Sequence, residues 1–386
     1  MKSKTHRSPM RRYTTALLLL GGLFLISPLA SAQLATCTGS EEYYVQWPKD
    51  GVPVWEMCFV TPENSSAADG SGLELREVYF GGYQVFERAH SPMLFADYSS
   101  STCYRDWKDV LSNFLADNET IGGVMAEPTM PVETTCDLSQ DPDIPVFNCP
   151  YATGRPGSDC FEGVAVQWEA NQLILSTQYS AAWYKYESRA FFFDDGSIEF
   201  LFGFGNSDGT GSGTTHWHHN YWRLDFDIDG TSDNDQVFLN DTLQSTEFSD
   251  LRDATGGPMG GPVTWSVIDQ ASGRGYRLEP SANDYNLIHN ESGSNYHEVD
   301  LMATQYHPGE FADNPDNFLS DCEMDETALV NGESLAGEDI VLYYMAGVKD
   351  TAGVDMMICK KAGPRLVPIG DWGPVTDVIF DSGSFE

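Results

Sequence analysis

The chain has 386 residues, and its 58 acidic and 21 basic side chains give it a net charge of −37 at pH 7. A surface this acidic repels the phosphates of nucleic acids and of anionic lipids, which argues against both as partners. An amine or polycationic ligand would be attracted instead.

Residues 1–32 have the pattern of a secretory signal. Five basic residues precede an apolar run at 16–26, and Ala30–Ala32 offers a small-residue cleavage site. The run is short for an uncleaved membrane anchor, and no later segment is long and apolar enough to span a bilayer. We therefore expect a mature chain that starts at Gln33, is secreted or periplasmic and carries a net charge of −42.

All eight cysteines follow the predicted signal. An even number in an exported protein predicts disulfides, although spacing alone leaves their connectivity open. The chain contains no C-x-x-C pair, so neither a thiolate zinc site nor a thioredoxin-type redox site is expected.

Strand-like runs recur between clusters of Gly, Asn, Asp and Ser, and helical periodicity is confined to 104–115. Length alone would allow one or two domains, but the pattern predicts a single all-β domain over 33–386, a large antiparallel sandwich. The predicted strands are 73–85, 164–168, 172–178, 190–193, 198–204, 221–228, 262–268 and 340–344.

The segment 180–200 contains two tyrosines, Tyr184 and Tyr186, at alternate positions of a predicted strand. Both therefore point to one face of that strand. Alternating aromatic residues on a strand are usually packed in a core, so this pair alone does not indicate a site.

The segment 216–230 reads HWHHNYWRLDFDIDG and carries the strongest functional signal. On a strand, His216 and His218 share a face and are close enough to bind one metal ion. The carboxylates of Asp225 and Asp227 follow as a second pair on one face. One strand thus carries a nitrogen-rich and an oxygen-rich candidate metal site.

An H-x-H followed by R-L-D-x-D-x-D-G resembles the copper strand of copper/topaquinone amine oxidases, and the resemblance extends over about residues 53–375. It covers the family's catalytic β domain but not its smaller N-terminal domains. The resemblance implies a large antiparallel β-sandwich, a homodimer, and oxidation of small primary amines by O2 to aldehyde, hydrogen peroxide and ammonia. It also implies a disulfide between Cys136 and Cys160.

The resemblance assigns roles to four residues near the expected copper ion. Tyr184, set by its distance from the Asp195-Gly196 turn, matches the tyrosine that becomes topaquinone, and Tyr98 matches a tyrosine that contacts this quinone. Ser112 stands at the position of the catalytic base. Asp350 stands where a third copper histidine is expected beside His216 and His218.

The resemblance also implies a peripheral calcium-type site. Carboxylate and carbonyl oxygens are suitable ligands for such a hard cation. The matching residues are Asp225, Phe226 (carbonyl), Asp227, Asp339 and Ile340 (carbonyl).

The chain departs from the family pattern at the active centre. A serine hydroxyl is too weak a base to replace the carboxylate at position 112 unaided, and Asp109, three residues earlier on the predicted helix, is a possible substitute. Trp183 and Lys185, on either side of Tyr184, also differ from the family's asparagine and acidic residue.

The sequence therefore leaves open which residue supplies the third metal ligand. Asp350 would complete a two-histidine, one-carboxylate centre that copper, iron or zinc would each tolerate. Alternatively, His219, His307 or another histidine could complete the set. Two functions follow: an exported copper amine oxidase, or a catalytically inactive or repurposed module that keeps the scaffold and a metal.

Overall fold

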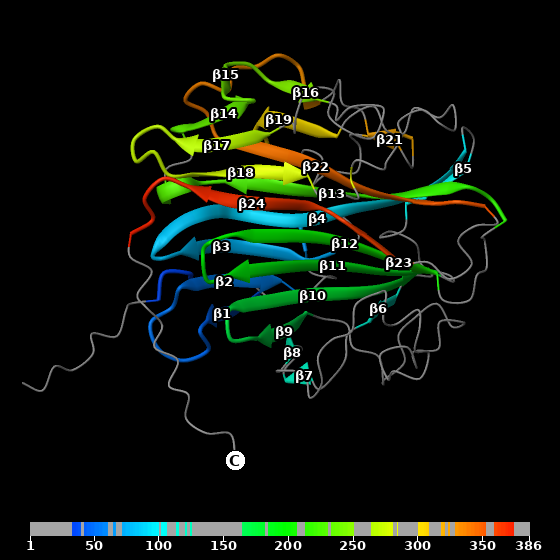
Figure 1. The fold of residues 1–386 in the computed structure, drawn as a ribbon, viewed down its shortest axis with the longest axis horizontal. Helices are drawn as coiled ribbons and strands as arrows, with labels where there is room; N and C mark the ends of the chain where they lie inside the picture. The colour runs from blue at the N-terminus through cyan, green and yellow to red at the C-terminus, as the bar shows by residue number, and fades with distance from the viewer. Residues whose placement is uncertain are drawn as a thin grey trace, which may run out of the picture. The chain divides into compact units, whose positions relative to one another are not determined.

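The computed structural model places most of the described residues in two large antiparallel β-sheets (Figure 1). At some strand positions, Tyr98 and Tyr184 among them, only the backbone is described. Within the part that is described, no helix is long and apolar enough to cross a membrane. The described residues are 33–39, 42–60, 65–66, 72–99, 102–105, 113–115, 120–121, 124–125, 164–181, 184–206, 213–230, 233–250, 264–280, 284, 300–308, 318–320, 323–324, 329–352 and 359–373.

The first sheet has nine strands, and two adjacent strands within it, β13 and β22, carry the candidate metal ligands. In spatial order the strands are β1 (Glu42–Trp47), β2 (Trp55–Val60), β3 (Glu74–Phe80), β4 (Tyr83–Ser99), β13 (His216–Phe226), β22 (Ile340–Asp350), β19 (Leu301–Gln305) and β16 (Phe248–Asp250), with β5 (Thr102–Arg105) beside β4.

The second sheet has eleven strands. Their order is β15 (Thr242–Gln244), β14 (Asp235–Leu239), β17 (Trp265–Asp269), β18 (Gly275–Pro280), β24 (Pro364–Ile369), β12 (Ile198–Asn206), β11 (Tyr184–Phe193), β10 (Gln172–Ala181) and β6 (Asn113–Leu115), with β23 (Cys359–Ala362) on β12 and β9 (Ala165–Trp168) on β10. The remaining elements are the hairpins β7 (Thr120–Ile121) with β8 (Val124–Met125) and β20 (Phe318–Ser320) with β21 (Glu323–Met324), and the 3-10 turn η5 (Ile228–Gly230).

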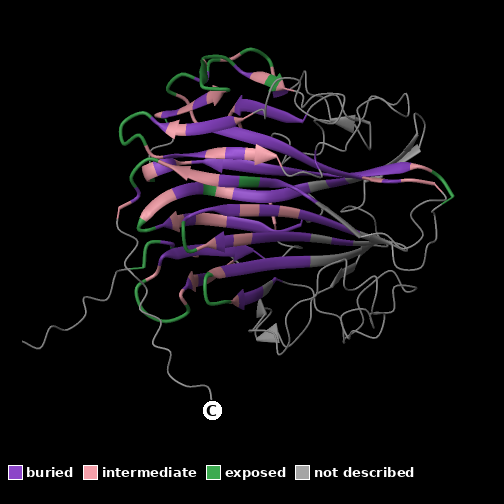
Figure 2. Ribbon diagram, viewed as in Figure 1, coloured by how far each residue is buried: buried purple, intermediate pink, exposed green. Residues whose placement is uncertain are grey.

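Aromatic side chains join the two sheets into a sandwich. Phe200 of the second sheet packs against Phe86 and Trp222 of the first, with ring centroids 6.0 and 4.7 Å apart. The indole Nε1 of Trp55 donates a 2.7 Å hydrogen bond to the carbonyl oxygen of Phe193 in the opposite sheet. Figure 2 shows the central strands buried over most of their length. The predicted all-β antiparallel sandwich is confirmed.

Two predicted elements were wrong in detail. The run 73–85 is a hairpin, because Gly81 and Gly82 adopt φ values of 59° and 90° and turn the chain between β3 and β4. The predicted helix at 104–115 begins and ends in strands, because its first residues pair with β4 and its last with β10. Sheet pairing overrides the local helical pattern at both ends of this run, and Asp109 and Ser112 between them lie outside the described residues.

A disulfide between Cys37 and Cys58, with Cα atoms 5.6 Å apart, ties residues 33–39 to β2. This supports the expectation that some of the cysteines are paired. The predicted partners Cys136 and Cys160 lie outside the described residues.

Candidate metal centre

Strand pairing creates the candidate metal centre. In the antiparallel ladder between β13 and β22, His216 lies directly opposite Asp350. His218 shares the face of His216, and the two imidazole centroids are 4.7 Å apart. The same-face geometry predicted from the H-x-H pattern is therefore present, and the neighbouring strand contributes a carboxylate to it.

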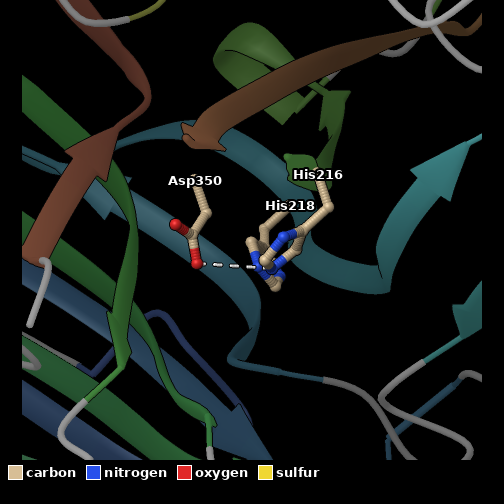
Figure 3. Close-up of side chains that lie close together, drawn as sticks. All are labelled: His216, His218 and Asp350. Carbon is tan, nitrogen blue, oxygen red and sulfur yellow. Dashed lines mark ion pairs between the residues drawn. The ribbon is translucent and has the colours of Figure 1, made fainter. Parts of the chain in front are cut away.

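The three side chains form a buried cluster (Figure 3). His216, His218 and Asp350 each have 0% relative exposure. One possible ligand atom from each lies within 4.8 Å of the other two, and no other described trio of this kind is as close. His216 Nε2 is 3.4 Å from Asp350 Oδ2. Two ligands bound to one tetrahedral metal at about 2.0 Å would be about 3.3 Å apart, so this spacing suits a shared metal ion.

The hydrogen bond on the far side of His216 fixes its tautomer. Nδ1 of His216 is 2.7 Å from the carbonyl oxygen of Thr214. A carbonyl oxygen can only accept, so the proton of this bond lies on Nδ1, and in the neutral imidazole Nε2 then carries a lone pair towards Asp350. Two facing lone pairs repel each other unless a proton or a metal cation lies between them. A backbone acceptor on the far nitrogen is also the usual support of a metal-bound histidine.

His218 is held by the opposite sheet. Its Nδ1 is 2.7 Å from the hydroxyl of Tyr186, and its ring stacks on Phe204 with centroids 3.8 Å apart. Tyr186 and Phe204 are cross-strand neighbours in β11 and β12. Both sheets therefore contribute to the centre. In the sequence, Tyr186 was visible only as the same-face neighbour of Tyr184.

Neither alternative histidine joins the cluster. His219 follows His218 on the strand and so faces the other side of the sheet. Burial lowers the pKa of His219 to about 3, so it stays neutral at physiological pH. Nε2 of His307 is 2.8 Å from Oε2 of Glu333, and the His307 side chain is 41% exposed. Of the candidates considered, Asp350 is the third residue of the cluster.

Comparison with solved structures places this cluster in a known scaffold. No family model and no curated protein matches the chain by sequence. A copper-containing benzylamine oxidase from Hansenula polymorpha matches with a TM-score of 0.51 and 14% identity, over 89% of this chain and 63% of that one. An amine oxidase from Aspergillus nidulans matches with a TM-score of 0.50 and 15% identity, over 92% of this chain and 55% of that one.

This is a copper amine oxidase-like fold. At such low identity the likeness concerns the fold alone, and the chain spans little more than half the length of these relatives. The donor set provides independent information, because two imidazoles and a carboxylate in a buried position fit a divalent transition-metal ion.

Four other residues were predicted to act at the active site, and the structure describes only the backbone of two of them. Tyr184 begins β11, opposite Asn206 of β12, and Tyr98 lies near the end of β4. Ser112 and Asp109 lie outside the described residues. The assigned roles of these four residues stay predictions.

The predicted calcium-type residues gather at the other end of the same two strands, where Phe226 lies opposite Ile340. Burial, and then repulsion by neighbouring carboxylates, raises the pKa of Asp227 to about 6 and that of Asp339 to about 7. Burial also raises the pKa of Asp225 to about 6, although Arg223, 3.1 Å away, opposes the shift. A bound cation would stabilise the ionised form of carboxylates that raise one another's pKa. The calcium-type site stays a prediction.

Asp235 is a buried carboxyl beside these residues, and it should make the protein less stable as the pH rises. It lies opposite Asp269 in the pairing of β14 with β17, and its Oδ2 accepts a 3.2 Å hydrogen bond from the amide of Ile228. Burial is the main cause that raises its pKa from 3.8 to about 8. The folded state keeps this proton after the unfolded chain has released it, so stability is lost as the pH rises from about 4 to 8.

We expect Asp235→Asn to be more stable than the wild type at pH 8 by on the order of 1–3 kcal/mol, with little difference near pH 4. Asparagine keeps an acceptor for the amide of Ile228. Urea unfolding at both pH values, with a chelator present, measures the difference. The exposed Asp241→Asn variant is the control, and a stability gain for Asp235→Asn that does not change with pH would contradict the assignment.

Proposed function

We propose that the chain is an exported copper amine oxidase that converts small primary amines and O2 into aldehyde, hydrogen peroxide and ammonia. One observation carries the proposal: a buried cluster of His216, His218 and Asp350 inside a copper amine oxidase-like fold. Copper bound there would supply the redox chemistry that converts a tyrosine to topaquinone and passes electrons to O2. Tyr184 is the proposed precursor.

The residues of the chain have separate roles in this proposal. His216 and His218 supply nitrogen ligands, and Asp350 supplies an anionic oxygen ligand that lowers the net charge of the centre. Their complete burial excludes bulk water and strengthens the electrostatic interactions there. The acidic surface attracts ammonium substrates, and Asp109 is the proposed proton acceptor in place of Ser112.

The test is aerobic loading of the purified full chain with copper. We expect a visible quinone band that shifts when phenylhydrazine is added, and hydrogen peroxide release when simple amines are supplied. Tyr184→Phe should bind copper as the wild type does and show no band. Metal analysis of each sample separates loss of copper from loss of the quinone.

Copper binding by the wild type without a quinone band would contradict the oxidase proposal. The chain would then be a metal-binding module on the same scaffold, an alternative favoured by the serine at position 112. A wild type that binds neither copper, iron nor zinc would remove both functions.

A further inference from the structure

Tyr186 and His218 make a polar contact between the two sheets at the metal centre. Tyr186 Oη and His218 Nδ1 are 2.7 Å apart, and both side chains have 0% relative exposure. Removing either partner of such a buried bond takes this hydrogen bond from the other, which is unfavourable where water cannot replace it.

Aromatic rings of the second sheet surround this pair. Phe204 stacks on the imidazole of His218 at 3.8 Å with planes 21° apart. Tyr186 stacks on Phe202, with centroids 5.9 Å apart, and packs against Phe204 at 5.7 Å. His218 therefore meets a stacking face and a hydroxyl, both from the second sheet, and its ring cannot turn without losing both contacts.

The chemistry of the bond links it to metal binding. A hydroxyl can donate or accept, whereas each nitrogen of a neutral imidazole does only one of the two. If the hydroxyl donates to Nδ1, the imidazole proton lies on Nε2 and blocks that nitrogen as a ligand. If Nδ1–H donates to Oη, the lone pair of Nε2 is available to a metal. The pair holds the same number of protons in both arrangements, so binding needs only a tautomer change and rotation of the hydroxyl.

We propose that Tyr186 is the positioning residue that stabilises the Nδ1–H tautomer of His218 and so presents Nε2 to the metal. The inference rests on the proposed metal centre and adds the residue that sets its affinity. Metal coordination makes Nδ1–H a stronger donor, so the hydrogen bond contributes more in the metal-bound state than in the metal-free state. Tyr186 thereby gives the second sheet a role in a site whose ligands all lie on the first.

The test compares Tyr186→Phe with Tyr276→Phe. Tyr276 is an equally buried tyrosine whose hydroxyl donates to the carbonyl oxygen of Gly196 at 3.1 Å, so the control loses a hydroxyl bond away from the centre. We expect competition titration with copper(II) to show binding about 10–100-fold weaker for Tyr186→Phe. For Tyr276→Phe we expect a change of less than about threefold.

A second measurement separates positioning from general destabilisation. Pulsed EPR of the copper-loaded proteins detects the remote nitrogen of each ligand imidazole. We expect its coupling to change for one imidazole in Tyr186→Phe and for none in Tyr276→Phe. Phe204→Leu, which keeps the hydroxyl and removes the stacked ring, should keep the wild-type coupling and provides a second variant should Tyr186→Phe fail to fold.

The outcomes distinguish this inference from the function on which it rests. Equal copper affinity in the wild type and Tyr186→Phe, or a changed coupling in Phe204→Leu, would overturn the role of Tyr186 and leave the metal centre in place. A wild type that binds no copper would overturn both.

Discussion

Replacing Asp350 with alanine is expected to weaken copper binding by more than about 100-fold, because loss of a direct ligand should exceed the 10–100-fold cost of losing an outer partner. The carboxylate is fully buried and lies 3.4 Å from His216 Nε2, so no solvent-exposed group can easily replace it. Metal titration in the presence of a competing chelator measures the affinity, and EPR reports the ligand atoms of bound copper.

Two further variants sharpen this prediction. Asp350→His should restore strong binding and show three nitrogen ligands, because it supplies the imidazole expected at this position in the resembled family. Asp339→Ala, near the start of the same strand, is the control and should bind copper as the wild type does. Wild-type affinity in Asp350→Ala would place the metal elsewhere.

Replacing Glu247 with alanine is expected to lower the free energy of unfolding by about 3–5 kcal/mol, since several buried bonds to a charged group would be lost. Glu247 is 6% exposed, and its Oε2 accepts hydrogen bonds from the amides of Asn331, Gly332 and Glu333 at 2.9, 3.1 and 3.3 Å. Its Oε1 accepts a fourth, from the amide of Gln305, at 3.0 Å. One carboxylate thus joins the loop before β22 to β19.

Urea unfolding of Glu247→Ala measures the loss, and Glu333→Gln is the matched control. The Glu333 side chain is 40% exposed and pairs with a partly exposed histidine, so its replacement should lower the free energy of unfolding far less than Glu247→Ala does. Similar losses in the two variants would show that the four amide bonds contribute little.

The fold and the two histidines could be predicted because they depend on local patterns. Alternation of period two identifies a strand and places His216 and His218 on one face wherever that strand lies in the sheet. Asp350 could be proposed only through the resemblance, because 132 residues separate it from His218 and no local pattern links them. Strand pairing brings them together.

Other features depend on long-range packing and could not be predicted. Tyr186 and His218 are in contact because the two sheets pack face to face, and no spacing of residues in the sequence predicts how the sheets pack. The pairing of Cys37 with Cys58 was one of many possible connectivities. The helix predicted over 104–115 was wrong for the same reason, because residues at its two ends pair with the strands β4 and β10.

The ladder between β13 and β22 places one pair of candidate ligands at each end, with His216 opposite Asp350 and Phe226 opposite Ile340. The ends are about 33 Å apart at the usual rise of a strand. A single residue inserted within either strand would turn the side chains beyond it to the opposite face. Relatives that keep both sites should therefore vary in length only outside 216–226 and 340–350, and a one-residue gap inside either range in an alignment would mark loss of a site.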